Sequence, residues 1–319
     1  MSPECANGEA CRQCTRADLV NKYADAPMLG QQSQNWHAPE THSRGYADND
    51  PHQFGDWCGL WLEQCLRVLK PGGHLIAFGG TRTWHRLASA AEDVGFEIRD
   101  SLAWLYSSGM PKSHNVGRAL SVSASNPEES RAAEDWSVWG TTLKPAFEPI
   151  VMGRRPLDGT MVENIRRWGV GPINTTAHRG LESSVGGHAT KWPTNVHLNS
   201  ELAEVLHDRV GQDPSDYFWV SKPPKAERPV VDGLAHPTVK PLDLLRTLVR
   251  RVTPPGGLVL DPFMGSGTTI EACLLEGFHV IGIEREATYI PLVEARVQRA
   301  SETTTSTSAS STPDQSGLF

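Results

Sequence analysis

The sequence predicts an α/β protein with a Rossmann-like, doubly wound and mostly parallel sheet that carries an inserted irregular region. Short apolar runs alternate with segments of helical apolar spacing, as in parallel strands connected by helices. One run ends in Asp261 and leads through a glycine-containing loop into a helix, the arrangement that binds nucleotides in doubly wound sheets. In the long middle region, 113–215, the apolar residues recur with neither helical nor strand spacing.

The first half of the chain supplies two strands and two helices. Helical spacing extends from Asp56 to Leu69 and is stopped by the Pro-Gly-Gly at 71–73. The run His74–Phe78 reads as a buried strand, and its continuation to Thr81 is either the wall of a site or a plain turn. A helix over Trp84–Val94 and a strand over Glu97–Tyr106 follow.

The second half repeats the alternation. The apolar positions of Pro241–Val252 predict an amphipathic helix, and Gly257 to Asp261 reads as a strand. We expect further elements at Ile270–Glu276 (helix), His279–Ile283 (strand) and Ala287–Ala300 (closing helix), and a short strand at Tyr217–Val220.

These elements divide the chain into five parts, which are an irregular N-terminal segment (1–50), the first part of the sheet (51–112), an irregular inserted region (113–215), the part with the glycine loop (216–300) and a Ser/Thr-rich tail expected to be disordered (301–319).

Composition fits a soluble globular protein of 319 residues, with 38% hydrophobic and 21% charged residues. The net charge of −7 argues against a non-specific nucleic-acid coat protein but allows an enzyme with one basic cleft. No apolar run approaches the roughly 18 residues of a membrane span, and no charged-then-apolar leader opens the chain. We therefore expect a cytoplasmic protein with no membrane partner.

The glycine loop is the strongest candidate for a ligand site. Gly265 and Gly267 permit a turn that a Cβ would obstruct, and the following helix offers free N–H groups. Glu284 ends the next strand about 20 residues after Asp261, a spacing at which an acidic residue binds ribose hydroxyls. No Lys follows the glycines, which disfavours a phosphate-binding P-loop. A glycine-rich turn without a ligand is the alternative.

Two stretches carry a family resemblance. Asp261 to Thr269 (DPFMGSGTT) resembles the S-adenosylmethionine (SAM) motif of the DNA amino-methyltransferases, which modify adenine N6 or cytosine N4. His236 to Pro241 (HPTVKP) resembles the element that precedes this motif in the same family. The resemblance extends from Trp57 to Ala300 and implies that SAM is held by Thr238, Lys240, Asp261, Pro262, Phe263, Gly265, Ser266, Gly267, Thr268, Thr269 and Glu284.

The resemblance implies a site-specific methyltransferase that acts on double-stranded DNA, with adenine N6 preferred and cytosine N4 left open. Its motif order (the beta type) makes 113–215 the target-recognition region. Residues 112–191 hold ten Lys and Arg against eight Asp and Glu, and Arg166 and Arg167 beside Trp168 suit contact with phosphates and bases. A solvated insert is the alternative, and a homodimer is left open.

The family's catalytic element, a strand followed by [D/N/S]-P-P-[Y/F/W], is not recognisable. Asp25-Ala26-Pro27-Met28 is the nearest segment, but it lacks the second proline and the aromatic residue. Catalytic residues are therefore unassigned, and a truncated, inactive SAM- or DNA-binding remnant is the alternative function.

The cysteines predict no metal site of their own. Cys5, Cys11 and Cys14 contain a single C-x-x-C pair, which is weak evidence for zinc because no second pair follows.

Overall fold

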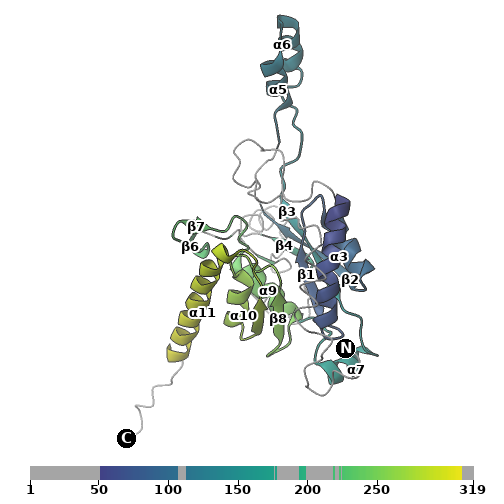
Figure 1. Cartoon of the computed structure of the whole chain (residues 1–319), viewed down its shortest axis with the longest axis vertical. Coiled ribbons are helices and arrows are strands. Elements are labelled where there is room, and N and C mark those ends of the chain that lie inside the picture. Colours follow the sequence, from purple (N-terminus) through teal and green to yellow (C-terminus); the bar gives the residue numbers. More distant parts are fainter. Residues whose placement is uncertain are drawn as a thin grey trace, which may run out of the picture.

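The computed structural model describes residues 51–106, 113–175, 177, 194–198, 218–219, 223 and 225–310 (Figure 1). For residues 198, 218–219, 226 and 304–310 it describes only the backbone. The N-terminal segment 1–50, with its three cysteines and Asp25–Met28, lies outside the described residues, as do 311–319. No helix within the described part of the chain is long and apolar enough to cross a membrane.

The main sheet has five strands in the order β1-β3-β2-β4-β5. β3 runs antiparallel between β1 and β2, whereas β4 pairs with β2, and β5 with β4, in parallel. Four of the five strands therefore run in one direction, which confirms the α/β class and the mostly parallel sheet. The strands are β1 (His74–Phe78), β2 (Glu97–Leu105), β3 (Phe147–Arg154), β4 (Val196–Leu198) and β5 (Phe218–Trp219).

β3 corrects the expectation that 113–215 is an irregular insert. It lies inside that region, yet it is paired along both edges, with Ile150 opposite Phe78 of β1 and Leu102 of β2. Its apolar run Ile150-Val151-Met152 is buried, and Ile150 is 0% exposed. An apolar run of this kind suits a strand buried on both faces, and the scattered glycines and prolines around it hid that signal in the sequence.

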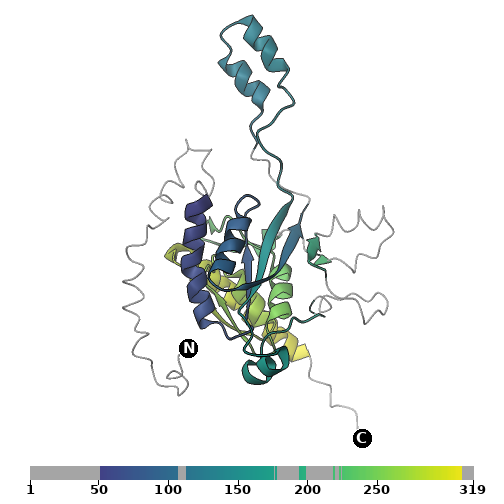
Figure 2. The same ribbon diagram turned by 90° about the vertical axis from the view of Figure 1, so that its right-hand side faces the viewer.

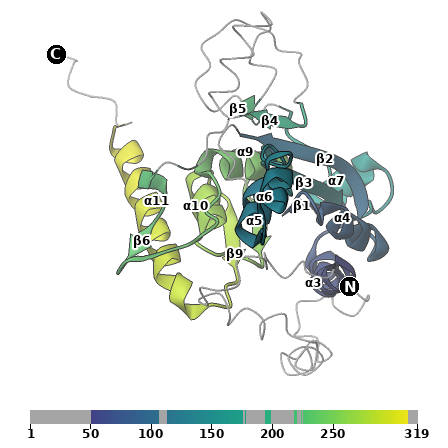
Figure 3. The same cartoon turned by 90° about the horizontal axis from the view of Figure 1, so that it is seen from above.

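Helices cover both faces of the sheet, as expected for a doubly wound fold. Val151 of β3 packs against α3 (Pro51–Val68) and α4 (Trp84–Asp93) on one face. Ile150 and Met152 pack on the opposite face, against α9 (Leu242–Val252) and α10 (Thr268–Leu275). Seen from above, the two helix pairs lie on opposite sides of the strands (Figure 3).

The glycine loop follows a separate sheet. β8 (Leu258–Asp261) and β9 (His279–Gly282) pair in parallel with each other, and no backbone ladder joins β8 to β1 among the described strands. The contact between the sheets is made by side chains, because Val259 and Val280 pack on the same α9–α10 core as Ile76 and Phe78. The single sheet expected from the sequence is thus divided in two within the described residues.

Two elements mark opposite ends of the body. The arm formed by α5 (Val116–Ser123) and α6 (Pro127–Glu134) follows the carboxyl end of β2 and returns to β3, and it projects far from the body (Figures 1 and 2). α7 (Met161–Trp168) lies at the amino end of β1, where Asn164 Nδ2 donates to the Pro71 carbonyl at 3.0 Å.

Short elements and one long helix complete the chain. The expected closing helix forms as η7 (Ala287–Tyr289) and α11 (Ile290–Ser310), so residues 301–310 are helical and not disordered as the sequence had suggested. The short elements between β5 and α9 are η6 (Lys225–Glu227), β6 (Val230–Val231) and β7 (Leu234–Ala235).

The role of β3 predicts a stability difference. Ile150→Ala should lower the free energy of unfolding by about 2 to 5 kcal/mol, because it leaves a cavity between the sheet and α9. Val122→Ala on the arm, where the side chain is 81% exposed, should change it by less than about 0.5 kcal/mol. Urea unfolding followed by circular dichroism measures both, and equal losses would contradict the central position of β3.

Candidate cofactor site

The loop after β8 is tied to the end of β9 by its backbone. Ile283 N–H donates to the Asp261 carbonyl at 2.8 Å, and Met264 N–H donates to the Ile283 carbonyl at 3.0 Å. The Asp261 carboxylate accepts the N–H of Phe263 at 3.0 Å. The carboxyl ends of β8 and β9 and the start of α10 therefore form one compact unit.

Both glycines of the loop are required by its geometry. Gly265 has φ of 55° and Gly267 has φ of 80°, conformations that other residues rarely adopt. A Cβ at Gly265 would lie 3.1 Å from His236 Nε2, and one at Gly267 would lie 3.1 Å from Val293 Cγ1. Close approach of the backbone to its neighbours thus adds to the conformational reason for glycine.

Glu284 closes the loop from the neighbouring strand. Its Oε2 accepts the Gly265 N–H at 2.7 Å, and its Oε1 accepts the Glu286 N–H at 2.8 Å. β8 and β9 are parallel, and Asp261 lies opposite Gly282. The carboxylates predicted from the sequence, Asp261 and Glu284, are therefore brought to the same edge.

The remaining loop residues differ in accessibility. Ser266 and Thr268 are buried and their hydroxyls lie 3.4 Å apart, so these side chains face the protein interior. Pro262 and Thr269 are partly exposed, and Phe263 is 52% exposed. Ser266 and Thr268 can therefore contact a cofactor only through their backbone atoms. Phe263, in contrast, can contact it through its exposed ring.

The stretch from His236 to Lys240 lies against the loop. The His236 ring packs on Tyr289 with a centroid separation of 4.7 Å, and its Nδ1 accepts the N–H of Thr238 at 3.2 Å. Burial lowers the pKa of His236; the Glu284 carboxylate opposes this shift and the charge of Lys240 adds to it. A neutral imidazole beside Gly265 is the expected state at neutral pH.

Lys240 links the loop side of the site to the main sheet. Its Nζ lies 2.7 Å from Glu148 Oε2 at the start of β3, and 4.9 Å from the centroid of the Phe78 ring at the end of β1. This contact favours Phe78 as a wall of the site over a plain turn. Glu148 was missed by the sequence reasoning, although its place at the start of an apolar run was a usable signal.

An aromatic group borders the other side of the loop. The ring of Phe263 lies 5.6 Å from that of Trp57 and 5.1 Å from that of Trp61, both on α3. The sequence assigned these tryptophans only to a helix. Their contact with Phe263 places α3 beside the loop that follows β8.

Arg166 and Arg167, expected to contact DNA, lie elsewhere. They belong to α7 at the amino end of β1, opposite the edge where Asp261 and Glu284 meet. Arg167 Nη1 is 2.7 Å from Asp158 Oδ2, and its guanidinium stacks 5.4 Å over Trp168. The structure therefore does not bring this pair to the candidate site.

No group of three or more His, Cys, Asp or Glu side chains that could hold a metal ion occurs within the described ranges.

A family model described as DNA methylase, for N6 and N4 methyltransferases, matches residues 23–295. The chain belongs to this DNA methylase family. The match spans β1, residues 113–215, the HPTVKP stretch and the glycine loop, so the geometry above is that of a DNA methylase.

Individual relatives are distant. The chain is 26% identical over 249 residues to the type II methyltransferase M.HindIII of Haemophilus influenzae, covering 76% of this chain and 69% of the relative. It is 24% identical over 250 residues to M.HinfI of the same species, covering 78% of this chain and 53% of that protein.

Two solved structures are also similar. The M1.HpyAVI–SAM complex has a TM-score of 0.43 and 19% identity over 76% of this chain and 83% of that one. The cytosine-N4-specific PvuII DNA methyltransferase has a TM-score of 0.45 and 17% identity over 82% and 78%.

The geometry of Glu284 predicts a specific defect. Glu284→Gln should weaken SAM binding by about tenfold or more, because an amide group places a donor against one of the two N–H groups that the carboxylate accepts. Isothermal titration calorimetry measures this affinity. Glu286→Gln, an exposed neighbour, is the matched control and should retain the affinity. Equal affinity in the two variants would remove Glu284 from the site.

Proposed function

We propose that this DNA methylase transfers a methyl group from SAM to an exocyclic amine at a specific site in double-stranded DNA, with adenine N6 the preferred acceptor. The observation that carries the proposal is the meeting of Asp261 and Glu284 at the ends of two parallel strands, around a loop that requires glycine twice. Such an edge binds nucleoside ligands in doubly wound sheets.

The residues present fit SAM. Glu284 would accept hydrogen bonds from ribose hydroxyls, and the half-exposed ring of Phe263 would offer an apolar surface to the adenine. Lys240 and Thr238 would lie on the side of the carboxylate, and the loop from Asp261 to Thr269 would surround the methionine part. When bound, SAM supplies an electrophilic methyl group.

The protein's task at the target base is electronic as well as positional. The lone pair of an exocyclic amine is conjugated with the ring, so hydrogen-bond acceptors must draw its N–H groups toward a tetrahedral nitrogen. An acidic or amide side chain and a prolyl carbonyl serve this purpose in the family element, and an aromatic side chain stacks on the flipped base. Asp25 to Met28 is still only a candidate for this element.

Double-stranded DNA would approach the edge where β1, β2 and β8 end. The arm leaves from this edge, and Arg82 lies there just after β1. We therefore propose that Arg82 and the arm residue Arg118 contact phosphates, with target recognition within 113–215. A homodimer and a cytoplasmic location are further parts of the proposal, and sedimentation of the purified chain tests the first.

Transfer of labelled methyl from SAM to mixed-sequence duplex DNA, followed by nucleoside analysis, tests the proposed activity. N6-methyladenine is the expected product. N4-methylcytosine would establish the alternative acceptor. Absence of transfer, with SAM still bound in a parallel titration, would favour an inactive SAM-binding remnant.

The proposed DNA surface has its own test. Arg82→Ala with Arg118→Ala should weaken duplex binding and reduce the slope of log K against log salt by about two, because two phosphate contacts are lost. Arg166→Ala with Arg167→Ala removes the same charge at the opposite edge and should leave that slope unchanged. Fluorescence anisotropy at several salt concentrations measures both, and a reversed pattern would contradict this orientation of DNA.

A further inference from the structure

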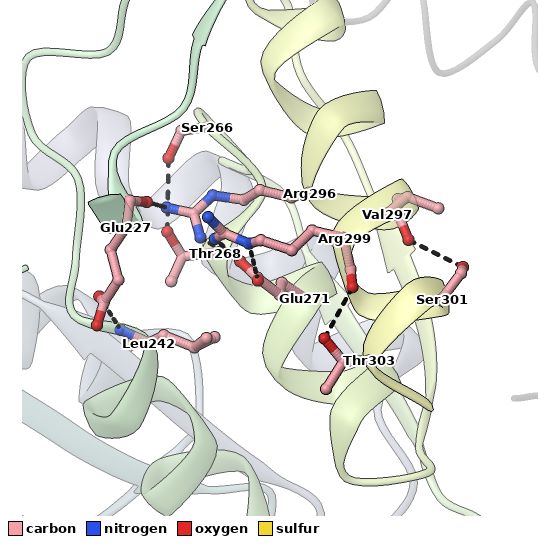
Figure 4. Close-up of polar contacts among 10 residues, drawn as sticks. All are labelled: Glu227, Leu242, Ser266, Thr268, Glu271, Arg296, Val297, Arg299, Ser301 and Thr303. Carbon is pink, nitrogen blue, oxygen red and sulfur yellow. Dashed lines mark hydrogen bonds and ion pairs between the residues drawn. The ribbon is translucent and has the colours of Figure 1, made fainter. Parts of the chain in front are cut away.

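A buried charged cluster lies behind the glycine loop, where α10, α11 and the η6 segment meet (Figure 4). Arg296 of α11 is 0% exposed and pairs with Glu271 of α10, which is 2% exposed. Arg299 donates to both carboxylate oxygens of Glu271 from Nε and Nη2, each at 2.6 Å. One carboxylate is thus shared by two guanidinium groups.

Arg296 also reaches a segment far away in the chain. Its Nη2 donates to the backbone carbonyl of Glu227 at 3.0 Å, while its Nη1 donates to Glu271. Glu271 lies in the first turn of α10, where its N–H donates to the Gly267 carbonyl at 3.1 Å. A single side chain therefore joins the helix that begins at the glycine loop to the η6 segment.

Glu227 extends this connection to the other half of the site. Its Oε2 accepts the N–H of Leu242 at 3.1 Å, at the first residue of α9. Lys240 and Pro241 immediately precede that residue. Glu227 therefore connects Arg296 to the start of α9, two residues after Lys240, whose Nζ pairs with Glu148.

We propose that Arg296 is a positioning residue that aligns the HPTVKP stretch with the glycine loop, so that both halves of the site engage one SAM molecule. The inference rests on the proposed function of this site. Arg296 acts through the Glu227 carbonyl and through Glu271, without touching the cofactor.

The charges of Arg296 and Glu271 indicate that the cluster orients the segments around the site and does not mainly stabilise the fold. Burying a guanidinium and a carboxylate costs desolvation free energy, and their attraction offsets that cost only when the geometry is good. A protein with two apolar side chains of similar size in their place is often as stable. An apolar side chain, however, cannot hold the Glu227 carbonyl. The fork of an arginine can bind a carboxylate and a carbonyl in fixed directions at once.

Three variants separate positioning from stability. Arg296→Met removes both the ion pair and the bond to Glu227. Glu271→Leu combined with Arg296→Met replaces the buried pair by apolar side chains, and leaves Arg299, which is 37% exposed, able to reach water. Arg299→Met is the matched control, because it removes an equal charge and two hydrogen bonds to Glu271 but leaves the bond from Arg296 to Glu227.

Calorimetric titration with SAM, well below each variant's melting temperature, gives the dissociation constants. Arg296→Met and the double variant should each weaken binding by about tenfold, which is the scale of one lost charge-assisted contact, and Arg299→Met by less than about threefold. In the transfer assay, KM for SAM should rise in the same proportion while kcat changes little, because the lost bonds lie away from the methyl group.

Two outcomes would overturn the inference. An unchanged affinity in the double variant would show that the bond to Glu227 does not align the site, and this variant decides the matter if Arg296→Met fails to fold. Equal weakening by Arg299→Met and Arg296→Met would assign the effect to Glu271 alone. Failure of the wild-type chain to bind SAM would instead reject the proposed function.

Discussion

The antiparallel ladder of β3 is the interaction on which the rest of the structure depends. It joins β1 to β2 along its two edges, and its alternating side chains supply the core under both helix layers. β3 also begins with Phe147-Glu148, which places a carboxylate beside Lys240 at the edge of the candidate cofactor site. The strand that completes the sheet therefore also fixes one wall of the site.

The main sheet and the β8–β9 pair are joined by side-chain contacts and not by backbone hydrogen bonds of the described strands. Backbone ladders hold each sheet together, but no described ladder joins them. Their relative placement depends on the α9–α10 core, on the rings of Phe263, Trp57 and Trp61, and on the ion pair of Lys240 with Glu148. A ligand site formed between the two sheets needs these side-chain contacts, because they hold the two sheets at a fixed distance and orientation around the ligand.

The glycine loop shows how local and distant constraints combine. Gly265 and Gly267 provide the turn, and Glu284 holds it from the adjacent strand. Behind the loop, Arg296 and Glu271 connect the first turn of α10 to a segment that leads to Lys240. The HPTVKP stretch ends about 20 residues before the glycine loop begins, so tertiary contacts determine how the two are placed relative to each other.

The sequence by itself determined the α/β class, most of the helices and strands on either side of the middle region, and the meeting of Asp261 with Glu284. These features depend on apolar period, on glycine at a turn and on the rule that parallel strands end at one edge, all of which are local or follow from topology. It did not predict β3 as a core strand, the position of α7 at the far end of the body, or the helical extension of α11 to Ser310. Nor did it indicate that Glu148, Tyr289 and Arg296 belong around the site. Those residues are brought there by packing between segments distant in the chain, and no period or motif in the sequence encodes which distant side chains will meet.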